Sequence, residues 1–224
     1  VEGVSHHSYH NVLYLAHNNI DVGVLPESWH IIRHPGFLTV SQARNLCIKN
    51  TITPYILWLD DDIVPTQLYE DVFINGFIDG VGIVGYDACV SHIGFESQWY
   101  VNPEIVIDYD YFDSPYAISL EMINDIGNYD ETIGRFTGSN TDICITAKSN
   151  NWKLQHIINP GLKHYRRARK NKYSSSQEQI DTSNSHKNLR KKHREWKKIT
   201  SSFVIDSRLQ FPDIKKRLGG YESI

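Results

Sequence analysis

Apolar runs that alternate with helix-like segments constrain the fold of this chain more than any other feature. Short apolar runs bounded by turn residues predict strands at Val12–Ala16, Ile31–Arg33, Tyr55–Leu59, Val81–Tyr86, Trp99–Ile107 and Leu154–Ile158. Helix-like patterns lie between them at Leu38–Asn50, Thr66–Ile78 and Thr141–Asn150. Strands that alternate with helices fold as a layered α/β sheet, and ligands of such sheets bind outside the carboxyl ends of the strands.

Charge divides the chain into two parts. The sequence has 224 residues, of which 40% are hydrophobic, and this is enough for the core of one α/β domain. Residues 1–162 hold 6 Lys and Arg against 20 Asp and Glu, whereas residues 163–198 hold 13 against 3. We therefore predict one domain over residues 1–165 and a basic loop with a C-terminal helical segment over residues 166–224. The acidic body argues against a nucleic-acid partner, because phosphates would be repelled from most of its surface.

The basic part itself is expected to have a loop and a helix. Arg166–Ser185 is nearly free of aliphatic residues and is predicted to be a loop, and Asn188–Ile199 is predicted to be a basic helix. No apolar run approaches the roughly 18 residues of a membrane span, and the N-terminus lacks the order of a signal peptide. We expect no transmembrane segment, and either a cytoplasmic protein or a soluble domain of a larger or membrane-associated one.

Three consecutive carboxylates, Asp60, Asp61 and Asp62, follow the apolar run in "PYILWLDDDIVP". Aspartates are common in turns, and a turn alone would account for them. Adjacent carboxylates repel one another, however, and a hard divalent cation such as Mg²⁺ or Mn²⁺ would relieve that repulsion. The D-x-D spacing at a strand end also places two carboxylates on the same side, because side chains alternate along a strand.

Two metal-using classes share this motif. The haloacid dehalogenase-like phosphatases have an apolar strand that ends in D-x-D-x-(T/V), which "WLDDDIV" satisfies, but their motif is expected near the N-terminus. The glycosyltransferases of the GT-A fold use D-x-D to hold a metal against the diphosphate of a nucleotide sugar. The sequence context favours the second class.

The segment from Phe37 to Tyr165 resembles the GT-A glycosyltransferases, in particular family-2-like enzymes, fungal Anp1-type mannosyltransferases and small viral transferases. The resemblance rests on "GFLTVSQARNLCIKNTITPYILWLDDDIVP", on "ISLEMINDIGNYDETIGRFTGSNTDICITAKSNNWKLQHI" and on "NPGLKHY", in that order. It implies a mixed, mainly parallel sheet flanked by helices. It also implies Mn²⁺- or Mg²⁺-dependent transfer, with inversion, from a UDP- or GDP-sugar to a hydroxyl of a glycan or glycoprotein. A module that binds a nucleotide sugar or glycan without turnover is the alternative.

The resemblance assigns roles at the metal. Asp62 would ligate the metal, and Asp60 would contact the metal, a metal-bound water or the ribose. Asp61 would assist at the donor. His164 in "GLKHY" would be the third protein ligand, with a surface histidine beside a basic run as the alternative.

Three further residues are predicted at the nucleotide-sugar donor. Arg44 and Asn45, in the "ARN" of the helix before the acidic strand, would line the donor site. For Arg44 the alternative is an exposed arginine paired with the many carboxylates of the body. The basic segment that begins at Arg166 is predicted to close over the donor diphosphate.

An inverting reaction needs a carboxylate to accept the proton of the acceptor hydroxyl. Asp142 is the predicted base, with Asp130 and Glu131 as second choices, whereas a retaining reaction would need none. Ser139-x-x-Asp142 is also a capping-box pattern, which would account for Asp142 without any chemistry.

Overall fold

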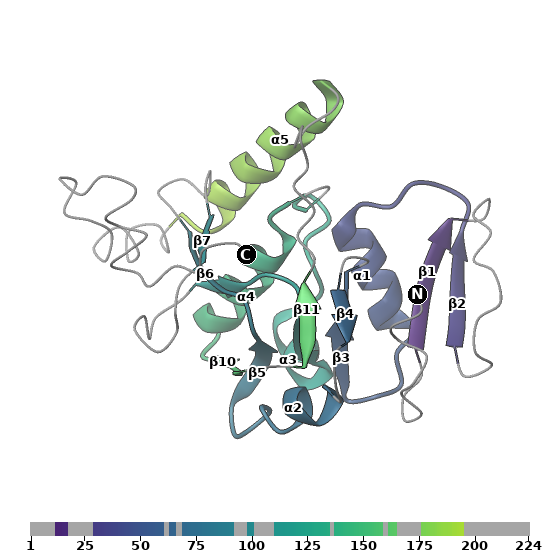
Figure 1. Cartoon of the computed structure of the whole chain (residues 1–224). Helices are drawn as coiled ribbons and strands as arrows, with labels where there is room; N and C mark the ends of the chain where they lie inside the picture. The colour runs from purple at the N-terminus through teal and green to yellow at the C-terminus, as the bar shows by residue number, and fades with distance from the viewer. Residues whose placement is uncertain are drawn as a thin grey trace.

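The computed structural model describes residues 12–17, 29–60, 63–65, 69–91, 98–100, 110–134, 137–158, 161–164 and 176–194. Its largest sheet has four strands in the order β10 (Lys153–His156), β5 (Val81–Gly85), β9 (Tyr116–Ser119) and β3 (Tyr55–Trp58). β5 and β10 pair in parallel, and β9 runs antiparallel to both β5 and β3. Three strands therefore run in one direction and β9 in the other (Figure 1). The sheet is mixed, as predicted, and two of its three pairings are antiparallel because β9 lies between β3 and β5.

Both faces of this sheet are apolar, and each is covered by helices. Ile83 and Ile118 point into a core cluster with α3 (Leu120–Ile126) and α4 (Ser139–Ser149). Val84 and Ala117, the neighbouring residues on the same strands, point into a second cluster with Phe73 of α2 (Glu70–Ile74). This alternation follows from the period of two along a strand, and it explains why β5 and β9 read as continuous apolar runs.

Three smaller sheets surround the main one. β1 (Val12–His17) and β2 (Trp29–His34) pair in parallel. β6 (Ala88–Ser91) lies between β7 (Gln98–Tyr100) and β8 (Tyr111–Phe112), and both pairings are antiparallel. β4 (Ile63–Pro65) and β11 (Leu162–His164) form an antiparallel pair that appears beside β3 in Figure 1.

Helix α1 (Val40–Lys49) begins at a complete capping box. The Thr39 side chain accepts a hydrogen bond from the Gln42 backbone N–H, and the Gln42 side chain accepts one from the Thr39 N–H. This reciprocal pair satisfies two of the donors that a helix N-terminus leaves open and fixes where the helix starts. Ser41, Arg44 and Cys47, at spacings of three, are buried on its inner face.

Helix α5 (Ser176–Lys192) corrects the prediction for the basic part of the chain. The predicted loop Arg166–Ser185 is wrong from Ser176 onward, and the predicted helix at 188–199 begins earlier than expected. Leu189 of α5 packs with Ile133 and Ile145 in a small buried cluster. Ser185 Oγ accepts a hydrogen bond from the Gly134 N–H, and Asn188 Nδ2 donates to the Thr132 carbonyl. The remainder of the predicted loop, residues 166–175, lies outside the described residues.

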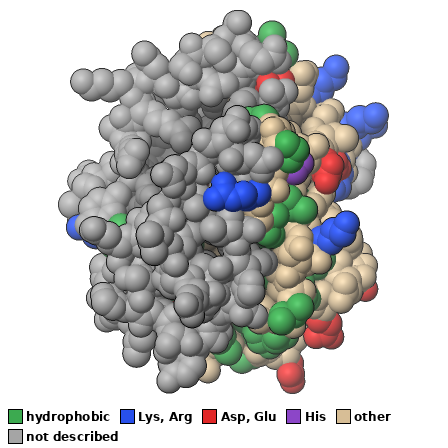
Figure 2. Space-filling view, turned by 90° about the vertical axis from the view of Figure 1, so that its right-hand side faces the viewer, with side chains coloured by type: hydrophobic (Ala, Val, Ile, Leu, Met, Phe, Trp, Pro, Cys, Tyr) green, Lys and Arg blue, Asp and Glu red, His purple; other side chains and the backbone are tan. Residues whose placement is uncertain are grey.

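The described surface is mixed in character. On the face shown in Figure 2, Lys and Arg side chains are interspersed with Asp, Glu and hydrophobic side chains. The described helices include none with the length and apolarity needed to cross a membrane. Cys47, Cys89 and Cys144 are all buried, and none of the three forms a disulfide bond.

Candidate functional site

The acidic motif begins where β3 ends. Asp60 follows β3 by two residues and is exposed. The backbone N–H of Ile63 donates to the carbonyl of Asp60 at 3.2 Å, so the chain turns back at once and enters β4. Asp61 and Asp62 lie inside this turn in the sequence and outside the described residues.

The pairing of β4 with β11 brings the predicted late histidine to the same place. In the antiparallel register, Ile63 is opposite His164, and Pro65 is opposite Leu162. His164 therefore lies across from the residue that follows Asp62 in the sequence. Among the described side chains, which exclude those of Asp61, Asp62 and His164, no three His, Cys, Asp or Glu side chains gather as a metal site would require. The prediction of a metal at Asp62, Asp60 and His164 stays a prediction.

Arg44 is buried inside a cage of aromatic rings. Its side chain is only 8% exposed. The guanidinium carbon lies 5.6 Å from the ring centre of Trp58 and 5.3 Å from those of Tyr116 and Tyr129. Each of these distances is within the range of a cation–π contact. The alternative of an exposed helix arginine is therefore wrong.

The same guanidinium reaches the first turn of α4. Arg44 Nη1 donates to Ser139 Oγ at 2.9 Å and to Asn140 Oδ1. Burial lowers the pKa of Arg44, but the nearby Tyr116, Tyr129, Asp60 and Asp113 more than offset this and raise it. Arg44 is therefore a permanent cation near neutral pH.

Two tyrosine hydroxyls complete the cage. Tyr116 Oη and Tyr129 Oη are 2.8 Å apart, and the Tyr116 hydroxyl also lies 3.3 Å from Asn140 Oδ1. Burial raises the pKa of Tyr129 to about 12 and raises the pKa of Tyr116 well above its usual value. Both tyrosines are therefore neutral hydrogen-bonding groups near neutral pH. The sequence had not indicated either of them.

Asn140 carries the network on to a carboxylate. Its Nδ2 donates to Asp113 Oδ1 at 3.3 Å, and the backbone N–H of Ser114 donates to the same oxygen at 3.1 Å. Asp113 lies in the turn between β8 and β9 and had no signal in the sequence. Its contact with Asn140 depends on the packing of this turn against the first turn of α4.

Asn45, the neighbour of Arg44, holds a loop. Its Oδ1 accepts from the Tyr129 backbone N–H at 3.0 Å, and its Nδ2 donates to the Tyr129 carbonyl and to Glu131 Oε1, both at 2.9 Å. These bonds keep the Tyr129 ring over Arg44. The predicted donor contact of Asn45 stays a prediction, and that of Arg166 lies outside the described residues.

Asp142 points to α5 in the structure. Its side chain is 2% exposed, and Oδ1 and Oδ2 lie within 2.7 to 3.0 Å of His193 Nε2 and Lys192 Nζ. The predicted capping box does not form, because the N-cap of α4 is Gly138 and no side chain caps it. Asp142 therefore anchors α5 to α4, and its predicted role as a base would require both partners to leave.

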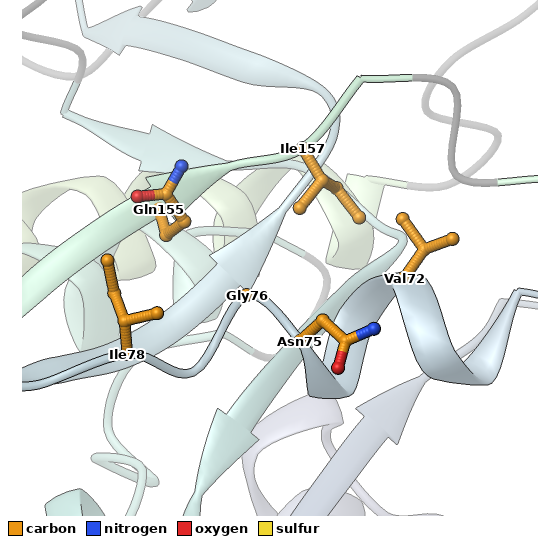
Figure 3. Close-up of a pocket in the computed structure, with 6 residues that line it drawn as sticks. All are labelled: Val72, Asn75, Gly76, Ile78, Gln155 and Ile157. Atoms are coloured by element: carbon orange, nitrogen blue, oxygen red, sulfur yellow. The ribbon is translucent and has the colours of Figure 1, made fainter.

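Two hollows are lined by described residues, and the second borders the network at Asn45. A cavity of about 460 Å³ between α2 and β10 is lined by Val72, Asn75, Gly76, Ile78, Gln155 and Ile157 (Figure 3). A second cavity of about 740 Å³ has Asn45 and Glu131 in its lining, together with residues of α1 and α3. Neither cavity contains Arg44, Asp60 or Asp142.

Comparison with known proteins gives a likeness at the level of the fold. No protein-family model and no curated protein matches the chain. The crystal structure of GalNAc-T7 with UDP, GalNAc and Mn²⁺ matches with 14% identity and a TM-score of 0.51. The match covers 61% of this chain and 32% of that one, so this chain spans about a third of the length of GalNAc-T7. The fold is GT-A.

Two further solved structures are similar at lower TM-scores. The catalytic domain of Drosophila β1,4-galactosyltransferase 7 with xylobiose has 9% identity and a TM-score of 0.44, over 68% of this chain and 64% of that one. The mannosyltransferase PcManGT from Pyrobaculum calidifontis with GDP-Man and Mn²⁺ has 11% identity and a TM-score of 0.42, over 58% and 39%. The GT-A fold agrees with the predicted resemblance and not with the phosphatase alternative.

Proposed function

We propose that this chain is a metal-dependent glycosyltransferase that moves a sugar from a UDP- or GDP-sugar to a hydroxyl of a glycan or glycoprotein acceptor, with inversion. The observation that carries the proposal is the β4–β11 register within a GT-A fold. It sets His164 opposite Ile63, the residue that directly follows the acidic motif. The "ARN" and "LWLDDDIV" segments favour a relationship to the family-2-like and Anp1-type enzymes.

The residues present fit a hard divalent cation. Asp60 is exposed at the carboxyl end of β3, and the two other carboxylates of the motif follow it in the sequence, before Ile63. Oxygen ligands from Asp60 and Asp62 with one imidazole from His164 form a set that suits Mn²⁺. When bound, the metal would stabilise the negative charge that develops on the departing diphosphate.

The described residues supply a rigid support for this chemistry. Arg44 packs on the ring of Trp58, the last residue of β3, and donates to Ser139 and Asn140. Its guanidinium also interacts electrostatically with the carboxylate of Asp60. The attraction between this guanidinium and the Asp60 carboxylate, which contributes to the raised pKa of Arg44, couples the start of the acidic motif to the aromatic cage.

The experiment is a titration of the chain with UDP-GalNAc, UDP-Gal and GDP-Man, each with Mn²⁺ and each with excess chelator. We expect at least one donor to bind only with Mn²⁺, and release of UDP or GDP to follow from it. Binding without any release, in the presence of a panel of glycan acceptors, would favour the non-catalytic module. Equal binding with Mn²⁺ and with chelator would contradict the metal role.

A further inference from the structure

Arg44 is an unusual group to bury on the inner face of α1. Burying a charge carries a large desolvation cost unless the charge is well solvated by the protein. Among the described residues, its hydrogen-bond acceptors are the neutral oxygens of Ser139 and Asn140, and three aromatic rings surround it. The carboxylates of Asp60 and Asp113 act on it through their charge and help to raise its pKa. The cation therefore organises the first turn of α4, to which it is bound at two adjacent residues.

One consequence is that Asn140 has a fixed amide orientation. Arg44 can only donate, so the Asn140 atom that it contacts must be the oxygen, and the Tyr116 hydroxyl also lies within reach of that atom. The amide nitrogen must then face the other way, toward Asp113 Oδ1 at 3.3 Å. Arg44 therefore fixes the orientation of the Asn140 amide, and the amide nitrogen in turn fixes the position of the Asp113 carboxylate.

Asp113 leaves the sheet at the same edge as the acidic motif. Tyr116, the first residue of β9, pairs with Trp58, the last residue of β3, and also with Gly85, the last residue of β5. Asp60 lies two residues beyond Trp58, and Asp113 lies three residues before Tyr116. Since β9 is antiparallel, both carboxylates emerge at the carboxyl ends of β3 and β5, where open α/β sheets bind their ligands.

We propose that Arg44, Asn140 and Asp113 form a relay whose outer member, Asp113, binds a sugar hydroxyl. Arg44 and Asn140 are positioning residues, because they act through Asp113. A carboxylate held by a backbone N–H and a side-chain amide is a preorganised acceptor for a hydroxyl donor. The relay rests on the proposed function, and the sugar belongs either to the donor or to the acceptor.

The test compares Asp113→Asn with Asp125→Asn. Asp125 is a matched control outside the relay, since its Oδ2 accepts one side-chain hydrogen bond, from Trp152 Nε1 at 2.8 Å. With Mn²⁺, we expect Asp113→Asn to bind UDP or GDP within about twofold of wild type. We expect it to lose about tenfold or more in binding either the nucleotide sugar or an acceptor glycan. Asp125→Asn should match wild type throughout.

Two arms identify the sugar. Calorimetry with the nucleotide sugars named above, without acceptor, reports a donor contact, and retention on a glycan array reports an acceptor contact. A loss in either arm supports the relay. If wild type binds a nucleotide sugar and Asp113→Asn behaves like wild type in both arms, the relay is wrong and the proposed function stands. If wild type binds no nucleotide sugar with Mn²⁺, the proposed function fails and the relay fails with it.

A second pair of variants separates positioning from general damage. Asn140→Asp keeps the acceptor for Arg44 but sets a second carboxylate against Asp113, so the melting temperature and sugar binding should both fall. In the double variant with Asn140→Asp and Asp113→Asn, the new amide at position 113 can donate a hydrogen bond to the new carboxylate at position 140. The melting temperature should therefore return toward that of wild type. Sugar binding should stay low in the double variant, because the carboxylate of residue 113 is gone. Recovery of both properties together would show that Asp113 is structural and would overturn the relay.

Discussion

His193 Nε2 lies 2.7 Å from Asp142 Oδ1, and both side chains are less than 10% exposed. Only the imidazole can donate to an ionised carboxylate, so His193 supplies the proton in this hydrogen bond. Lys192 Nζ is 3.0 Å from the same carboxylate. These contacts join the C-terminal end of α5 to α4, the helix whose first turn is bound by Arg44.

We predict that Asp142→Asn destabilises the protein by about 2 kcal/mol, because hydrogen bonds to charged groups contribute about 1.5 to 3 kcal/mol. Denaturant unfolding gives the change, and turnover is measured on the same sample. The expected result is an active, less stable variant. A variant of unchanged stability whose turnover falls by about a hundredfold would instead identify Asp142 as the base.

The end of α5 should loosen in acid through Asp130. Burial raises the pKa of Asp130, but hydrogen bonds from the side chain and backbone of Thr132, together with Lys192, more than offset this and lower it. A lowered folded-state pKa means that Asp130 stabilises the fold above the unfolded value of about 4, and that this stabilisation is lost as the pH falls through the folded value.

The corresponding measurement is the melting temperature of wild type and of Asp130→Asn between about pH 3 and pH 7. Because Lys192 and Asp130 are about one-third exposed, the difference at pH 7 should correspond to less than about 1 kcal/mol. It should shrink toward zero near pH 3. A difference that is the same at pH 3 and pH 7 would contradict the ionic contribution of Asp130.

Gly134 should not tolerate a side chain. Its φ is +83°, and a Cβ there would lie 2.6 Å from both Ser139 Cβ and Ser41 Oγ. Gly127 is the matched control, because its φ is +90° but nothing lies within 4 Å of the added atom. Gly127→Ala should show only the cost of its backbone conformation (φ +90°, ψ 174°), which L residues avoid, about 1 to 3 kcal/mol. Gly134→Ala should lose about 1 to 3 kcal/mol more because of the steric clash. If both variants lost the same stability in thermal unfolding, Ser41 of α1 and Ser139 of α4 would be able to move apart around the new Cβ without cost, and the prediction would be wrong.

Mn²⁺ dependence should disappear when a ligand is removed. Asp62→Ala and His164→Ala should each weaken nucleotide-sugar binding in the presence of Mn²⁺ by about tenfold or more, because each would remove one of the proposed metal ligands. Calorimetry with Mn²⁺ and with chelator provides the comparison. Asp79→Ala, which removes an aspartate remote from the motif, should bind as wild type does. Binding by His164→Ala that equals wild type would remove His164 from the ligand set.

Much of the fold was readable from the sequence because it depends on local patterns. Tyr55–Leu59 and Val81–Tyr86 are apolar runs between turn residues, and both are strands of the main sheet, β3 and β5. The helix at Leu38–Asn50 was also correct, since α1 carries its own start signal at Thr39. The acidic motif at the end of β3 needs no partner to be recognised.

Tertiary structure decided the rest, because those features depend on residues far apart in the chain. β9 is inserted antiparallel between β3 and β5, and this pairing brings Asp113 to the edge that holds Asp60. The part of α5 before Asn188 has too few apolar residues to be predicted. The helix is held where Leu189 packs on Ile145 of α4 and on Ile133, and where Lys192 bonds to Asp142. Arg44 and Asp142 show the limit most clearly. A sequence gives their charge, whereas the packing of α1 and α5 against α4 determines that Arg44 bonds to Ser139 and Asn140 and that Asp142 bonds to Lys192 and His193.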